Sequence, residues 1–96
     1  MFNKMKDLME MKKQADRIKK ELDSSIVEVN TVNGVRIVVN GSQNFQSVEI
    51  DDALVHVDRK KQLEENVLRS INDAIKKSQN LAAQKMKVIM PGFPGM

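Results

Sequence analysis

The sequence has no cysteine, no tryptophan and no tyrosine, and its single histidine is His56. Without cysteine there is no disulfide and no thiolate metal site, and one histidine is too few for a zinc site built from Cys and His ligands. A metal-binding or general-base role for His56 needs partners that the sequence does not place beside it. We therefore expect no metal, no cofactor and no catalytic activity, and we interpret His56 as a structural or surface residue.

Aromatic residues and long apolar runs are also scarce. The three phenylalanines, Phe2, Phe45 and Phe93, are too few and too scattered to form a stacking platform for single-stranded nucleic acid. No segment approaches the roughly 20 apolar residues that a membrane-spanning helix needs. The first ten residues have charged or amide side chains every few positions instead of the apolar stretch of a secretory signal. We expect a cytoplasmic protein that binds neither a membrane nor a small-molecule substrate.

The length of 96 residues indicates one domain, which we place at residues 1–90, followed by a Pro- and Gly-containing tail at 91–96. The net charge is +3, and it is unevenly distributed. Residues 1–24 have a balance of +2, residues 25–57 of −3 and residues 58–96 of +4. The basic charge therefore lies in the flanking segments, and the middle of the chain is acidic.

Residues 4–23 are predicted to form a helix, with Asn3 as its N-cap and Asp23-Ser24-Ser25 as its end. An apolar seam of period 3.5 supports this prediction. The seam residues are seven apart or at the complementary heptad position: Met1, Leu8, Ala15, Leu22, Met11 and Ile18.

The segment from Val27 to Ile50 is predicted to form a three-stranded antiparallel meander, and side-chain parity decides its first turn. A two-residue loop at Asn33-Gly34 puts Val27 and Val29 on the wrong face. A three-residue loop, residues 32–34, makes the apolar faces agree, with Gly34 at positive φ. We predict the three-residue loop, which gives the pairs Thr31–Val35, Val29–Ile37 and Val27–Val39.

The second turn is predicted to be a four-residue loop at 41–44. It gives the pairs Val39–Gln46, Ile37–Val48 and Val35–Ile50. One face of the sheet is then apolar: Val27, Val29, Val35, Ile37, Val39, Val48 and Ile50. The other face is mostly polar and has a loose apolar patch at Ile26, Val38 and Phe45.

A second long helix is predicted from its N-cap Asp58 to about residue 90, where Pro91-Gly92 ends it. Its apolar residues keep helical spacing: Leu63, Val67, Ile71, Ala74, Ile75, Leu81 and Val88. In the connection at 51–58, three residues are expected to tuck under the core: Leu54, Val55 and Val57.

The predicted fold is α+β, in the order α-β-β-β-α, with a three-stranded antiparallel meander flanked by two long helices. A helix rises about 1.5 Å per residue, so helices of about 20 and 30 residues overhang strands that are about 20 Å long. The apolar stripes continue past the sheet and need a partner surface. A two-fold homodimer is the commonest oligomer, so we expect an obligate homodimer.

Four stretches of the chain occur in an order that is typical of one family. They are a Met- and Lys-rich first helix at 1–22, VRIVVNG at 35–41 followed by VEID at 48–51, DALV and then LEENVLRSINDAIKK up to Lys77, and MPGFPGM at 90–96. In this order the chain resembles the YbaB/EbfC family of bacterial nucleoid-associated proteins over nearly its whole length. Two departures concern loops: the first hairpin has only Gly34 where the family usually has several glycines, and Asp52 stands where the family often has proline.

The resemblance implies a dimeric, tweezer-like assembly with protruding helices that binds double-stranded DNA with weak or variable sequence preference. It implies no catalytic activity and a place at the nucleoid in the cytoplasm. The charge pattern by itself favours an ordinary solvated helix face, and the resemblance reverses that preference. The predicted DNA-binding residues are Lys4, Lys6, Lys12, Lys13, Lys19, Lys20, Arg69, Lys76, Lys77, Lys85 and Lys87.

The last four of these lysines are the strongest candidates, because residues 74–96 contain four lysines and no acid. Glu49, Asp51 and Asp52 suggest a Mg²⁺ site only superficially, since the sequence has no glycine-rich phosphate loop. We interpret these acids as keeping the end of the sheet soluble and repelling DNA, which restricts contact to the helices.

The methionines of the first helix allow more than one interpretation. Met1, Met5, Met9 and Met11 could form an adaptable partner groove or part of a membrane-surface helix. Core or dimer packing is preferred, because they fall mainly along the seam. The predicted dimer interface comprises Ile26, Val38, Phe45, Leu8, Met11 and Ile18. The alternative function is a protein–protein adaptor in replication or recombination, with the lysines serving as solubilising charge.

Overall fold

The computed structural model describes residues 4–89 of the chain. The elements follow in the predicted order: α1 (Lys4–Ser24), β1 (Ile26–Val32), β2 (Val35–Asn40), β3 (Phe45–Ile50), the 3-10 helices η1 (Asp52–Leu54) and η2 (Val57–Arg59), and α2 (Lys60–Ile89). The antiparallel sheet has the order β1-β2-β3. The α+β fold and its order are therefore confirmed. The predicted N-cap Asn3 and the tail at 91–96 lie outside the described residues.

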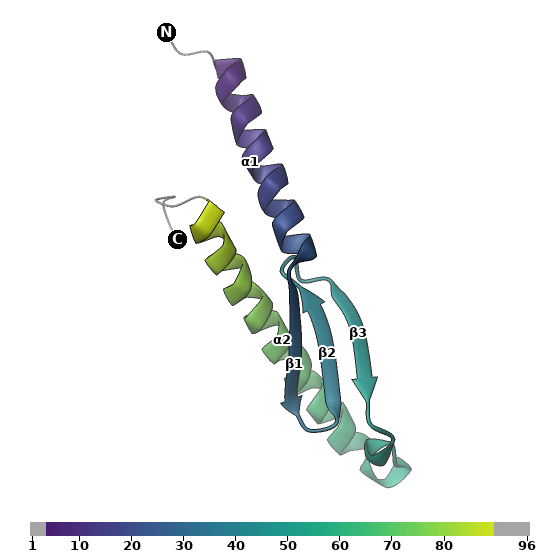
Figure 1. The fold of residues 1–96 in the computed structure, drawn as a ribbon. Helices are drawn as coiled ribbons and strands as arrows, with labels where there is room; N and C mark the ends of the chain where they lie inside the picture. The colour runs from purple at the N-terminus through teal and green to yellow at the C-terminus, as the bar shows by residue number, and fades with distance from the viewer. Residues whose placement is uncertain (1–3, 90–96) are drawn as a thin grey trace.

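The molecule is elongated, with extents of 71 × 20 × 17 Å. Figure 1 shows why: α2 runs obliquely along one face of the sheet, whereas α1 leaves the end of the sheet and projects beyond it. The 21 residues of α1 span about 30 Å at a rise of about 1.5 Å per residue. The predicted overhang of the helices past the short strands is confirmed.

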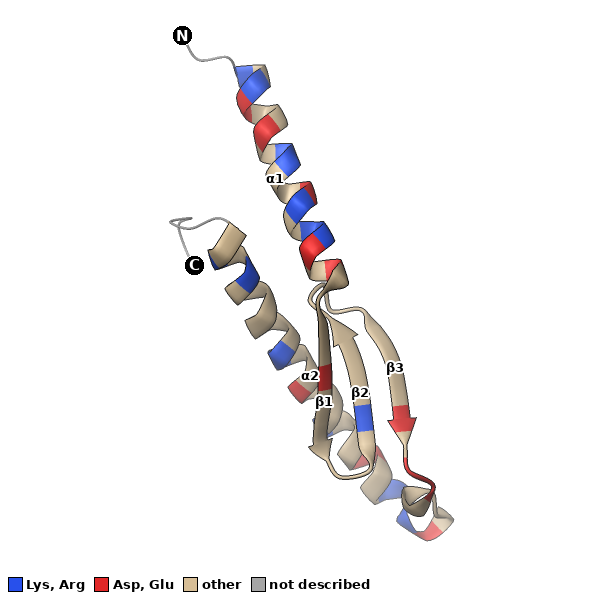
Figure 2. Ribbon diagram, in the orientation of Figure 1, with Lys and Arg blue, Asp and Glu red and all other residues tan. Residues whose placement is uncertain are grey.

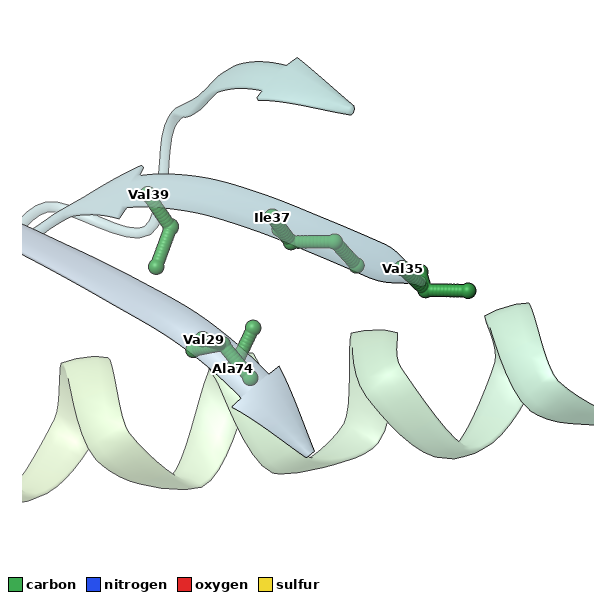
Figure 3. Packing of buried hydrophobic residues seen from close by; sticks show 5 residues of the cluster. All are labelled: Val29, Val35, Ile37, Val39 and Ala74. Carbon is green, nitrogen blue, oxygen red and sulfur yellow. The ribbon is translucent and has the colours of Figure 1, made fainter. Parts of the chain in front are cut away.

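The core lies between α2 and the first two strands. Its buried apolar residues are Val29, Val35, Ile37, Val39 and Ala74, each 1% exposed or less (Figure 3). Ser70 and Ser78 are also fully buried and stand one helical turn on either side of Ala74. This stripe of small side chains on α2 allows the helix to approach the sheet closely.

The two buried serines have hydrogen-bond partners, which removes the cost of burying a hydroxyl. Ser70 Oγ donates to the Asn66 carbonyl at 2.8 Å, and Ser78 Oγ donates to the Asn40 carbonyl at 2.7 Å. The second bond also ties α2 to the end of β2. Apolar spacing along the helix did not indicate either serine as a core residue, because both are polar.

The first hairpin corrects one prediction and confirms two others. Val32 pairs with Val35 across a two-residue turn, so the three-residue loop is wrong and Thr31 does not oppose Val35. The pairs Val29–Ile37 and Val27–Val39 are nevertheless confirmed, because the register shifts within β1 between Val29 and Val32. Gly34 has the predicted positive φ, at 93°. The extra residue that parity required lies in the strand instead of the loop.

The second hairpin has the predicted loop at 41–44 and the predicted pairs Ile37–Val48 and Val35–Ile50. The pair Val39–Gln46 is wrong, because a register shift between Val38 and Val39 brings Val39 opposite Phe45. Directly opposed residues of an antiparallel pair have their side chains on the same face. Phe45 therefore lies on the face of the sheet that includes Val39 and Val48, and not in the predicted outer patch with Ile26 and Val38.

The apolar face of β3 is not covered as β1 and β2 are. Phe45, Val48 and Ile50 are 36–50% exposed, since α2 packs mainly against β1 and β2. The predicted apolar face is therefore packed against the core only on the first two strands. These three residues, called here the β3 row, remain an apolar strip beside the core.

The connection from the sheet to α2 differs from prediction at three positions. Asp58 lies inside η2 and α2 begins at Lys60, so Asp58 is not its N-cap. Leu54 packs against the core as expected, but Val55 and Val57 are exposed, Val57 at 92%. Two successive 3-10 turns, which sequence spacing did not indicate, turn these valines outward.

Candidate nucleic-acid interface

The candidate cations of α1 lie along an arm in which none of the described residues is buried. Lys4, Lys6, Lys12, Lys13, Lys19 and Lys20 are all exposed. Figure 2 shows that acidic residues alternate with them along the helix. The structure thus places these lysines where a large ligand can reach them, on a surface of mixed charge.

The C-terminal end of α1 determines where this arm points. The last carbonyls of a helix lack partners within the helix. Here the Gly41 N–H donates to the carbonyls of Leu22 and Ser25, both at 2.9 Å, and Asn40 Nδ2 donates to the Asp23 carbonyl at 3.3 Å. The β2–β3 loop therefore caps α1 and attaches it to the sheet.

The cations of α2 fall into two groups, which the sequence pattern did not separate. Lys77 pairs with Asp73 at 3.2 Å, and Lys85 pairs with Glu21 of α1 at 3.0 Å. Lys76 and Lys87 are exposed and form no ion pair with any residue from 4 to 89. The acid-free run at 74–96 gave no sign of the partner of Lys85, which is 64 positions away in the sequence.

Asp73 connects α2 to β1 as well as to Lys77. The hydroxyl of Thr31, an exposed residue of β1, donates to Asp73 Oδ2. This hydrogen bond, and then the one from Lys77, lower the pKa of Asp73 below its usual value. Asp73 is therefore ionised at neutral pH and neutralises Lys77.

Arg69 and Lys76 border the same groove along α2. Its lining also includes Thr31, Glu65, Leu68, Asn72 and Asp73. The two cations are seven positions apart and so lie on one side of the helix. Because two acids share the groove, its charge is close to balanced.

The acids of the sheet form an ion-pair cluster on the face turned away from α2. Arg36 Nε contacts Glu28 Oε1 at 2.7 Å, and Arg36 Nη1 contacts Glu49 Oε2 at 3.4 Å. The hydrogen bond from Arg36, and then one from Asn30, lower the pKa of Glu28 to about 2. Of the acids that we expected to repel DNA, Glu49, Asp51 and Asp52, only Glu49 belongs to this cluster and is partly neutralised by Arg36.

The predicted dimer residues do not form one surface in a single chain. Leu8 and Met11 are exposed on the α1 arm, and Ile18 is half-buried near its base. Val38 and Phe45 lie on opposite faces of the sheet, and Ile26 is exposed at its edge. Sequence reasoning missed the exposure of Val48, Ile50 and Leu68. The sequence did not indicate the β3 row, because Phe45 joins Val48 and Ile50 only through the register shift between β2 and β3.

Within residues 4–89, no group of three or more His, Asp or Glu side chains is placed to hold a metal ion. No helix in the same range is long and apolar enough to cross a membrane. What the described part of the chain offers is an elongated α+β protein with two cationic helices and an uncovered apolar strip.

Comparisons with known proteins agree with an α+β protein that has cationic helices. The model of the YbaB/EbfC DNA-binding family matches residues 1–93. A nucleoid-associated protein of Syntrophobacter fumaroxidans is 34% identical over 98 residues, covering 99% of this chain and 89% of the relative. One from Chloroflexus aggregans is 34% identical over 94 residues, covering 96% and 93%. A crystal structure of an uncharacterized Helicobacter pylori protein shares the fold, with a TM-score of 0.65 and 20% identity over 80% of this chain and 90% of the other.

The chain belongs to the YbaB/EbfC DNA-binding family, whose curated relatives here are named nucleoid-associated proteins. The resemblance read from the sequence is confirmed. The family is one of DNA-binding proteins from bacteria and not a known class of enzyme.

Proposed function

We propose that this chain binds double-stranded DNA as a homodimer, through phosphate contacts of lysines on α1 and α2, with weak sequence preference and without catalysis. It would act in the cytoplasm at the nucleoid, as the names of its relatives suggest. The observation that supports this most is the placement of charge. The exposed lysines lie on two helices that extend past the sheet, whereas the sheet acids Glu28 and Glu49 are engaged by Arg36.

Phosphate contact explains why sequence preference is expected to be weak. Lysine side chains neutralise phosphates and release counterions without reading base edges. Lys76 and Lys87 are the strongest candidates, since neither forms an ion pair within the described residues. Lys77 and Lys85 are weaker candidates, because each must leave a carboxylate before it can contact a phosphate.

A second copy of the chain is the proposed occupant of the exposed apolar surface. The β3 row lies beside the core, and the seam residues Leu8 and Met11 lie along α1. Large exposed apolar patches on soluble proteins commonly mark interaction sites. Two copies that share these surfaces would bring four basic helices into one assembly. A sedimentation experiment at micromolar concentration should give the mass of a dimer, and a monomer with a cooperative thermal transition would contradict this part.

The adaptor function stays as the alternative, because Met5, Met9 and Met11 are 61–74% exposed. Flexible methionine side chains suit a surface that accepts a protein partner. In that case the lysines serve only solubility, and duplex DNA would not bind.

A mobility-shift titration of linear duplex DNA at 50 and 200 mM salt separates the two functions. The DNA function predicts micromolar or tighter binding at the lower salt and a steep loss at the higher salt. Duplexes of unrelated sequence serve as controls and should bind with affinities that agree within about threefold, since phosphate contacts dominate. Absence of binding at 50 mM salt would reject the DNA function.

A further inference from the structure

Three elements meet at Asn40, Gly41 and Ser42, which we call the joint. The Gly41 N–H donates to the Leu22 and Ser25 carbonyls, both at 2.9 Å, and Ser42 Oγ donates to Asp23 Oδ1 at 2.5 Å. From the other side, Ser78 Oγ of α2 donates to the Asn40 carbonyl at 2.7 Å. The joint therefore holds the base of α1 and the middle of α2 against the same three residues.

The backbone of Gly41, in the β2–β3 loop, lies close against the last turn of α1. It is buried, and a Cβ atom there would lie 3.0 Å from the Leu22 carbonyl oxygen and 3.2 Å from Leu22 Cα. Its φ lies outside the left-handed region, in contrast to that of Gly34. An alanine at 41 would therefore fit the backbone of the loop without strain but would press directly on the backbone of α1.

An ion pair braces the two helices near the joint. Lys85 of α2 contacts Glu21 of α1 at 3.0 Å, with both side chains only partly exposed. The main-chain carbonyl of Glu21 also accepts hydrogen bonds from Ser24 Oγ at 3.1 Å and Ser25 Oγ at 2.6 Å. Glu21 is thus held in the last turn of α1 in a position to receive Lys85.

We infer that the joint, braced by Lys85 and Glu21, sets the angle between α1 and α2, and that Lys85 is a positioning residue and not a phosphate ligand. Only the expected effect on DNA affinity rests on the proposed function. A helix of 21 residues is about 30 Å long and acts as a lever. An alanine at 41 would push the base of α1 away by about 0.4 Å, which is enough to restore an ordinary van der Waals distance to Leu22. The rotation that results would move the N-terminal tip of α1 by about 2 Å.

The absence of cysteine permits a direct measurement of the angle. Lys13→Cys on α1 and Gln84→Cys on α2 introduce two exposed spin-label sites, and an excess of unlabelled chain leaves one labelled pair in each assembly. Gly41→Ala should shift the mean distance between the labels by about 1 Å, because Lys13 lies about halfway along the helix whose tip moves by about 2 Å. Asn44→Ala is the matched control. Asn44 lies in the same loop, but its side chain forms none of the hydrogen bonds to α1 described above, so the distance should stay unchanged. An unchanged distance in folded Gly41→Ala overturns the inference.

The brace is tested with Glu21→Gln, Lys85→Gln and the charge swap Glu21→Lys/Lys85→Glu. A brace predicts that both single variants broaden the distance distribution alike and weaken DNA binding alike, by about two- to fivefold, the range available to an exposed ion pair. The swap should restore both. Asp16→Asn and Lys61→Gln give the baselines for losing one acid from α1 and one lysine from α2.

Opposite effects would overturn the positioning role. If Lys85 contacts phosphate, Glu21→Gln should strengthen DNA binding beyond the Asp16→Asn baseline, and Lys85→Gln should weaken it. In that case the charge swap would not restore the affinity for DNA. If the wild-type protein does not bind DNA, the proposed function fails and the label distances alone decide this inference. If Gly41→Ala does not fold, the distances in the two brace variants decide it in the same way.

Discussion

The two helices contain similar numbers of lysines but are held in place by different means. α2 buries Ser70, Ala74 and Ser78 against the sheet and forms one wall of the core. α1 has no buried residue and is attached mainly through its last turn. A helix of the first kind stabilises the fold, whereas one of the second kind is an arm whose direction depends on a few hydrogen bonds. Their lysines should therefore respond differently to mutation.

The largest expected effect concerns the body of the molecule. Ile37→Ala removes the largest fully buried side chain between β2 and α2 and should lower the free energy of unfolding by about 2–5 kcal/mol. Met9→Ala, on the exposed part of α1, is the control and should change it by less than about 0.5 kcal/mol. Urea denaturation followed by circular dichroism measures both. Similar losses would show that the arm contributes to the stability of the fold.

A smaller effect is expected at the hairpin that packs next to the core. Gly34→Ala places a side chain at φ 93°, where its Cβ would lie 2.7 Å from Leu54 Cδ1. Strain at one such residue costs about 1–3 kcal/mol of unfolding free energy. Gly41→Ala avoids that backbone strain and should cost less, because α1 can move. If denaturation gives Gly41→Ala the larger loss, the base of α1 is part of the rigid body.

The smallest effect is the pH dependence of the outer face of the sheet. Glu28 has a pKa of about 2 in the folded chain against an ordinary 4.5, so the folded state binds its proton less readily. Its contribution to stability is complete above pH 4.5 and is lost as the pH falls toward 2. The lowered pKa of Asp73 acts in the same direction. Arg36→Gln should reduce the loss of unfolding free energy between pH 4.5 and 2. Added salt should reduce it as well, since the Arg36–Glu28 pair is exposed. If the unfolding free energy of the variant falls with pH as in the wild type, Arg36 is not the cause of the lowered pKa of Glu28.

The strand pairing was largely predictable, because it depends on alternation within short segments. The pairs Val29–Ile37 and Ile37–Val48 follow from keeping one face apolar. The bulge in β1 was not predictable, because an extra residue in the loop and one in the strand satisfy the same parity. The direction of α2 across the sheet was not predictable either, so the exposure of Val48 was missed.

The candidate site was predictable as a set of basic residues but not as a geometry. The acid-free run of residues 74–96 drew attention to α2. Spacing cannot reveal a pair such as Lys85–Glu21, which exists because α1 and α2 leave the joint side by side. Nor can it distinguish Lys76, which forms no ion pair within residues 4–89, from Lys77, which reaches Asp73 one turn away.

The most direct test compares two variants that remove equal charge from α2. Lys76→Gln/Lys87→Gln removes the lysines without acidic partners, and Lys77→Gln/Lys85→Gln removes the paired ones. Duplex affinity is measured for each between 50 and 200 mM salt. Each lost phosphate contact reduces the salt slope by about 0.9, so the first variant should reduce it by about 2 to 4 in a dimer and the second by less than about 1. Equal reductions, or a slope unchanged in the first variant, would contradict DNA binding through the unpaired lysines of α2.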